Sequence, residues 1–529
     1  MNASPPTAVG PAQPANASGV FGLYPATDFR ITSGADGGGA TLRQAMWYFR
    51  SETIALPRPG LPAATFAPGM RALDDVRAWA RTRASDAPID YPPLVWVAAP
   101  TIIRHARIAD GGRGLVTREG VSPFEPMPKI PLNRSYFDAS SIAFLSSRRI
   151  TVRGTPTPTG FVAHTFWPED FKLGGRPPPL RVLPDAAVPA QAMRALMREA
   201  PRGGAQSPYS AATLWQRNAA LADWSGRPVL AFMVNGAQGD DDEAHAGHFA
   251  LVTGRIADDG GMGDWLVNNY YSLDSESEKG IIAAPVPLDN YLGDLNAGQS
   301  WYRPSCILVA VLRHARAAEL VQSACNRVYN QFYRHQLVYY HPSANCTSIS
   351  IDALRALGWP IRARGASNRW LAWLGFPFIV LQEKSLRKAK LAFDYLCTDQ
   401  TRLLPAAALE EACGSLLALA HDAAGGHRSG LAALLAQDLD ALAFVRIPQL
   451  PSSRTFGDAP AVTTREYRMR VPKDPALAQI IPVPPRPFPD ALRDPDLLPS
   501  PWYPSDYAAL VWGALAVAAI ALLLWRAWQ

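Results

Sequence analysis

Cys346 stands in a sequence context that favours nucleophilic chemistry. The chain has five cysteines, and this one lies in the stretch HPSANCTSISIDALRALG, where a polar loop leads into a helical pattern that Gly358 is expected to end. The positive end of a helix dipole lowers the pKa of a thiol below its ordinary value of about 8.5 and so favours the nucleophilic thiolate. Cys346 is therefore the candidate nucleophile. The alternative is a small apolar residue that fills a gap in the core.

A histidine at the start of an apolar strand is the candidate base. His248 follows a glycine and opens the stretch HFALVTGRI, so that a titratable side chain is expected at a sheet edge where a cleft can form. The next predicted strand, DWLVNNYYS, carries Asn268 and Asn269. An amide there can orient the imidazole, as the third member of a thiol triad does. Adjacent strand residues point to opposite faces, so only one asparagine can serve. A satisfied strand-end histidine and turn asparagines remain the alternative.

The acidic loop before this strand allows a different interpretation. Two histidines and four acidic residues could bind a divalent metal: His245, His248, Asp240, Asp241, Asp242 and Glu243. A loop enforces no ligand geometry, however, and a solvated acidic loop explains the same residues. We therefore predict no metal and no cofactor.

The elements that must position these residues alternate between strand and helix. The apolar and turn patterns predict helices over 207–224 and 316–335, and strands over 228–236, 248–256, 264–272 and 305–313. The helix that begins at Cys346 follows them. The order is thus a strand with His, a strand with Asn, a further strand, a long helix, and then Cys at a helix N-terminus.

This order resembles the circularly permuted papain-like hydrolases, which include NlpC-type peptidases and lecithin:retinol acyltransferase-like enzymes. The stretch NRVYNQFYRHQLVYYHPSANCTSISIDALRALG further resembles the Lnb N-terminal periplasmic domain family, in which an aromatic-rich segment leads to an Asn-Cys pair on a helix. The resemblance covers roughly residues 225–360. It implies that Cys346 is the nucleophile and His248 the base. It also implies that Asn268 or Asn269 is the orienting amide and that Tyr340 lines the pocket. It also implies that the backbone N–H of Cys346 donates to an oxyanion.

The predicted fold class is α+β. A permuted papain-like domain, in which an antiparallel sheet packs on the Cys-bearing helix, is joined to an accessory N-terminal domain and a single C-terminal transmembrane helix. We predict a disordered leader over 1–20, an accessory α/β region over 21–204 and the catalytic domain over 205–360. A helical and membrane-contacting region over 361–448, a Pro-rich linker over 449–506 and the transmembrane helix over 507–526 are expected to follow.

Two segments suggest lipid as a partner. From Ala508 to Trp525 no residue is charged, and 18 helical residues span about 27 Å, close to the thickness of a bilayer core. We expect contact with the bilayer through residues 507–526. The apolar stretch RWLAWLGFPFIVLQ is followed by a segment with three lysines, which suits contact with anionic lipid near residues 370–390. The alternative for the second segment is a buried helical hairpin.

Charge and composition narrow the remaining possibilities. The net charge is +6, but the basic residues are scattered, so no nucleic-acid surface is expected. The many arginines and few lysines suggest a bacterial protein. The N-terminus lacks a recognisable signal peptide, which favours a cell-membrane protein with a cytoplasmic bulk; the alternative is periplasmic, because the resembling family is usually exported. The sequence thus predicts a membrane-anchored cysteine hydrolase or acyltransferase that acts on an amide or (thio)ester bond of a lipid or envelope-related substrate. The alternative is an inactive, membrane-tethered binding module.

Overall fold

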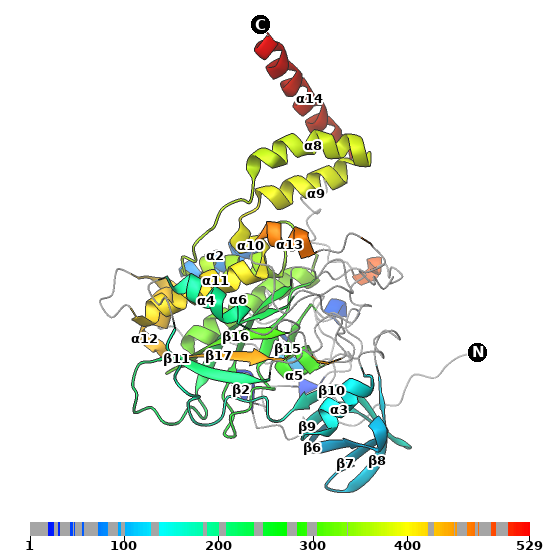
Figure 1. Ribbon diagram of the computed structural model, residues 1–529, viewed down its shortest axis with the longest axis vertical. Helices are drawn as coiled ribbons and strands as arrows, with labels where there is room; N and C mark the ends of the chain where they lie inside the picture. Colours follow the sequence, from blue (N-terminus) through cyan, green and yellow to red (C-terminus); the bar gives the residue numbers. More distant parts are fainter. Residues whose placement is uncertain are drawn as a thin grey trace, which may run out of the picture.

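The computed structural model (Figure 1) describes residues 20–25, 30–31, 43–45, 47, 55–57, 72–82, 94–96, 101–127, 137–183, 188–199, 208–236, 247–271, 283–293, 304–335, 337–421, 428–448, 450–451, 463–470, 474, 488–492 and 506–528. The expected leader over 1–20, apart from Val20, lies outside these residues. So do the acidic loop before His248 and most of the expected Pro-rich linker.

A seven-stranded antiparallel sheet forms the centre of the molecule. Its strand order is β11-β17-β16-β12-β13-β14-β15, and every neighbouring pair is antiparallel. The strands are β11 (Ser210–Gln216), β12 (Pro228–Asn235), β13 (His248–Arg255), β14 (Leu266–Asn268), β15 (Pro285–Pro287), β16 (Ser305–Leu312) and β17 (Leu439–Ile447). The predicted strands over 228–236, 248–256, 264–272 and 305–313 are thus confirmed, the third in a shorter form.

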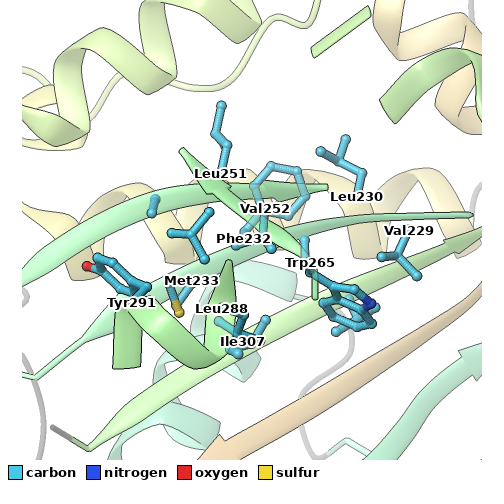
Figure 2. Packing of buried hydrophobic residues seen from close by; sticks show 14 of the residues in the cluster. Val229, Leu230, Phe232, Met233, Leu251, Val252, Trp265, Leu288, Tyr291 and Ile307 are labelled. Carbon is cyan, nitrogen blue, oxygen red and sulfur yellow. The ribbon is translucent and has the colours of Figure 1, made fainter. Parts of the chain in front are cut away.

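Both faces of this sheet are covered. Figure 2 shows Leu230 and Leu251 on one side of the sheet and Val229, Met233 and Trp265 on the other, as the two-residue repeat of a strand requires. All five side chains are buried. A sheet buried on both faces needs continuous apolar strands, which explains why runs such as PVLAFMVN and SCILVAVL do not alternate.

Helices cover the side on which Leu230 and Leu251 lie. These are α6 (Arg316–Tyr333), α7 (Cys346–Ala356) and α11 (Pro405–His421). The rings of Phe232 and Trp359, the latter just after α7, are 5.5 Å apart, and the Tyr270 hydroxyl donates to the backbone carbonyl of Cys325 in α6. An antiparallel sheet therefore packs on the Cys-bearing helix, as the α+β part of the predicted fold class expects.

The opposite face meets the short helix α5 (Leu288–Gly293) and a closed five-stranded barrel. The barrel consists of β6 (Thr101–Ala109), β7 (Gly114–Thr117), β8 (Gly120–Pro126), β9 (Ile150–Thr157) and β10 (Gly160–Pro168), with α3 (Ala139–Ser146) beside it. Arg153 of the barrel is buried and pairs with Asp289 of α5 at 2.7 Å and with Asp264 at 3.0 Å. The barrel lies within the expected accessory region over 21–204 and shares one continuous apolar core with the sheet.

Two strands depart from the sequence prediction. The predicted helix over 207–224 contains β11 instead, and the predicted helical region over 361–448 ends in β17, which lies between β11 and β16.

The remaining elements are short or peripheral: β1 (Val20–Phe21), β2 (Tyr24–Pro25), β3 (Arg30–Ile31), β4 (Ala55–Pro57), β5 (Leu94–Trp96), α2 (Ala72–Thr82), η3 (Asp110–Gly112), α4 (Pro189–Arg198), α10 (Gln400–Leu403), α12 (Gly430–Asp438), α13 (Thr464–Arg470) and η7 (Asp490–Leu492).

A helical hairpin lies at one end of the molecule. It consists of α8 (Arg369–Glu383) and α9 (Leu386–Cys397), and α14 (Asp506–Trp528) extends from it to the C-terminus (Figure 1). A membrane span requires about 20 consecutive and predominantly apolar residues. In the part of the chain that the structure describes, no helix meets both requirements of length and hydropathy. The predicted single-pass transmembrane helix over 507–526, and with it the membrane-spanning part of the predicted fold class, is therefore wrong.

Candidate active site

Cys346 is the first residue of α7, and a well-formed cap fixes it there. The side-chain oxygen of Asn345 accepts hydrogen bonds from the N–H groups of Thr347 and Ser348 at 2.9 and 2.8 Å. The hydroxyl of Ser348 in turn accepts the N–H of Asn345 at 2.8 Å. This reciprocal arrangement is a capping box. At the other end Gly358 has φ +91°, the left-handed conformation typical of a residue after a helix C-terminus. Both predicted ends of the helix are confirmed.

The loop before Cys346 is closed by hydrogen bonds of its own. Tyr340 and Ala344 exchange two backbone hydrogen bonds at 3.0 and 2.7 Å. The Asn345 amide group also donates to the carbonyl of His341 at 2.6 Å. The direction in which α7 begins is therefore set by the loop and the cap together, which holds the Cys346 sulfur in one place.

The surroundings of the Cys346 sulfur act on its pKa in opposite directions. The side chain is buried, with 5% of its surface exposed, and this burial raises the pKa of the thiol above its ordinary value. The backbone N–H of Phe249 and the hydroxyls of Thr347 and Tyr339 donate toward the sulfur and lower the pKa. Burial is the larger effect, so the expected lowering of the pKa by the helix N-terminus is wrong in direction. The donors nevertheless lie where they would stabilise a thiolate.

His248 reaches this place from the sheet. It is buried at the start of β13 and directly precedes Phe249, whose backbone N–H lowers the pKa of the Cys346 thiol. The His248 ring lies 6.3 Å from the rings of both Tyr271 and Tyr291, measured between centroids. The helix that begins at Cys346 packs against the strand that begins at His248, so the two candidate residues, 98 positions apart in the chain, belong to adjoining elements.

A tyrosine joins the two sides of the site. The ring of Tyr271 lies 5.5 Å from the ring of Tyr339, so Tyr271 contacts the histidine side and Tyr339 the cysteine side. The backbone N–H of Cys346 donates to the Tyr339 hydroxyl at 3.5 Å. This hydroxyl is thus within reach of both the backbone N–H and the sulfur of the same residue.

The two candidate asparagines lie on opposite faces of the sheet. The Asn268 amide donates to Gln322 of α6 at 3.0 Å and accepts from it at 2.9 Å, within the helix-covered face. Because Asn268 pairs with Leu251, the continued register places Asn269 opposite Ala250, on the same face as His248. Of the two residues, Asn269 is the one that can approach the imidazole. Its side chain is buried.

Tyr340 points away from this constellation. Its hydroxyl donates to Asp394 of α9 at 2.8 Å, whereas its neighbour Tyr339 lies at the sulfur. The sequence pointed to Tyr340 and did not single out Tyr339, Thr347, Tyr271 or the N–H of Phe249. The alternation of neighbouring side chains made Tyr339 as good a candidate as Tyr340, and an antiparallel register between the two predicted strands would have placed Tyr271 opposite His248.

The alternative metal site falls largely on residues outside those described, namely Asp240, Asp241, Asp242, Glu243 and His245. Among the described residues no group of three or more His, Cys, Asp or Glu side chains could hold a metal ion.

A capped cysteine, with a tyrosine hydroxyl 3.5 Å from its backbone N–H, begins the helix α7, which packs against β13, the strand that begins with His248. This is the arrangement of a candidate thiol site. Compared with known proteins, the chain matches no family model, no curated protein and no solved structure.

Proposed function

We propose that the protein is a cysteine-dependent hydrolase or acyltransferase. The Cys346 sulfur attacks the carbonyl carbon of an amide, ester or thioester, and His248 takes the thiol proton and returns it to the leaving group. The resulting acyl–sulfur bond is then broken by water or by an acceptor nucleophile. The observation that carries the proposal is the packing of α7, whose capped N-terminal residue is Cys346, against β13, whose first residue is His248.

Further groups of the site suit this chemistry. The Cys346 N–H and the Tyr339 hydroxyl lie 3.5 Å apart, and both can donate to an oxyanion that forms on the attacked carbonyl. Asn269 shares the sheet face of His248 and is the better candidate to orient the imidazole. A lipid or envelope-related substrate is supported by the exposed apolar surface of α8, which is joined to the loop before Cys346 through the Tyr340 hydroxyl and Asp394.

A second candidate function is favoured by a specific observation. Cys346 is buried and its pKa is raised, as expected of an unreactive core thiol. In that case the protein is a binding module with the same architecture and no covalent chemistry.

Acylation of Cys346 separates the two functions. The full-length protein is incubated with p-nitrophenyl acetate, and the acetylated peptide is identified by mass spectrometry. An enzyme is expected to accumulate acetyl on Cys346, and His248→Ala should slow this step by about 100-fold or more, the usual contribution of a general base. His314→Ala is the matched control, because this histidine is exposed and pairs with Asp438 at the opposite end of the sheet.

The result that favours the binding module is equally clear. Acetyl groups on the half-exposed Cys397 but not on Cys346 would refute the assignment of Cys346 as the nucleophile. Equal rates of Cys346 acetylation in His248→Ala and His314→Ala would refute the assignment of His248 as the general base.

A further inference from the structure

The helix α8 carries an apolar stripe on its outward side. Trp370, Trp373, Leu374, Phe378 and Leu381 expose 82%, 60%, 70%, 65% and 78% of their surfaces. Their spacings of 3, 1, 4 and 3 residues place all five on one side of a helix. Soluble proteins rarely leave large apolar side chains gathered in this way without a binding role.

The opposite side of α8 is held against α9. Ala372 is buried, and the ring of Phe376 lies 6.1 Å from the ring of Phe393 in α9. Trp373 lies at the edge of the stripe, where its ring reaches the same phenylalanine at 5.0 Å. Asn368 caps α8 through the N–H of Leu371 at 2.9 Å. The hairpin therefore has its own packing and caps, and the stripe is left outward by a formed helix.

Basic residues accompany the stripe. Residues 369–397 contain five Lys or Arg and two Asp or Glu, which gives a net charge of +3. Both acidic residues pair with lysines, Glu383 with Lys388 and Asp394 with Lys390. The excess positive charge therefore belongs to exposed residues at the ends of α8 and the start of α9, where Arg369, Lys384 and Arg387 lie.

We propose that the α8–α9 hairpin docks on an anionic lipid surface, with α8 lying in the plane of the interface. Tryptophans on an apolar helix face favour the boundary between headgroups and acyl chains, and the adjacent cations are complementary to anionic headgroups. A second protein surface would match the apolar stripe but would not require the positive excess. The proposal does not rest on chemistry at Cys346.

Vesicle co-sedimentation with the full-length protein tests the apolar stripe. The probe is large vesicles of phosphatidylcholine with or without phosphatidylglycerol. The double variant Trp370→Ser/Trp373→Ser should partition at least about tenfold more weakly, because two large apolar side chains no longer leave water. The matched control is Leu180→Ser/Val182→Ser, which removes two exposed apolar side chains outside the hairpin. All variants keep α14 unchanged, so its exposed apolar residues cannot cause a difference between them.

The charge is tested separately. Neutralising Lys384, Arg387 and Lys388 to Gln should weaken binding to phosphatidylglycerol vesicles by roughly tenfold or more and leave binding to phosphatidylcholine alone unchanged. The matched control removes the same three charges from exposed positions of the barrel, Arg107, Arg113 and Arg118. Added salt should reduce the difference between the two lipid compositions.

Three results would overturn the docking proposal. The first is a wild-type chain that does not sediment with phosphatidylglycerol vesicles. The second is an equal effect of the hairpin variants and their matched controls. The third is a sedimentation-velocity experiment in which Trp370→Ser/Trp373→Ser dissociates a dimer while vesicle binding is unchanged, since the stripe would then be occupied by a second copy of the chain.

Discussion

Replacing Tyr339 by Phe should raise the pKa of the Cys346 thiol. The substitution keeps the ring that packs between Tyr271 and His341 and removes only the hydroxyl. That hydroxyl is one of the donors that lower the pKa of Cys346 against the effect of burial. Without it, the thiolate loses a stabilising donor in a site that water does not reach well.

The size of the change follows from the strength of such a contact. A hydrogen bond to a charged group contributes about 1.5–3 kcal/mol, and one pKa unit corresponds to 1.36 kcal/mol. The N–H of Cys346 also competes for the Tyr339 hydroxyl, at 3.5 Å, so the lower end of this range applies. We expect the pKa to rise by about one unit and alkylation near neutral pH to slow about tenfold, since the reactive thiolate is then a minority species.

The assay is the pH dependence of iodoacetamide labelling at Cys346, followed by peptide mass spectrometry. Tyr340→Phe is the matched control, because it removes a hydroxyl from the adjacent residue that donates to Asp394 instead. The reasoning is refuted if Tyr339→Phe leaves the labelling profile of Cys346 unchanged, or if Tyr340→Phe shifts it by the same amount.

Three further substitutions test the framework of the site. Asn345→Ala removes the cap of α7 and should lower the free energy of unfolding by about 1 kcal/mol in chemical denaturation; Asn345→Asp, which can still cap, should retain most of it. Arg153→Met leaves the buried Asp289 carboxylate without its nearest cation and should cost about 3–5 kcal/mol, whereas Arg153→Met with Asp289→Asn should recover part of that loss. Burial raises the pKa of Cys325 to about 12, so the protonated thiol is favoured by folding, and stability is lost as pH rises above the unfolded pKa. Between pH 8.5 and 10 the contribution of Cys325 to this loss amounts to about 2 kcal/mol, so the pH dependence should be weaker by that amount in Cys325→Ala; an identical pH dependence in both proteins would contradict it.

The strands nearest the candidate site could be predicted from the sequence, whereas the far edge of the sheet could not. β12, β13 and β16 are continuous apolar runs bounded by turn residues, which is the pattern of buried strands. β17 is also mainly apolar, apart from Asp440 and Arg446, but it directly follows the Ala- and Leu-rich α12. A short apolar run after a helical pattern does not reveal by periodicity where the helix ends. Its pairing with β16, which lies more than a hundred positions earlier, decides the strand.

The candidate site shows the same division between local and tertiary information. The helix start at Cys346 and the turn at Gly358 depend on a few adjacent residues, and the sequence predicted them. The direction of Tyr339 and the sign of the pKa shift depend on what packs against the loop. A helix N-terminus favours a thiolate by a modest amount, whereas complete burial opposes it by more, and the degree of burial is a property of the folded chain.

The opposition between burial and hydrogen-bond donors also bears on how Cys346 and His248 would work together. A thiolate–imidazolium pair that persists in the resting protein requires a thiol pKa below that of the imidazolium. Burial instead raises the pKa of Cys346, so the neutral thiol is the resting form. In the proposed reaction the proton would then leave as the sulfur attacks, with His248 as the general base in that step. The donors around the sulfur, Phe249, Thr347 and Tyr339, would stabilise the charge only while it develops. In the proposed reaction, this order of events would make attack depend on a bound substrate and would leave the buried, neutral thiol slow to react with unrelated electrophiles.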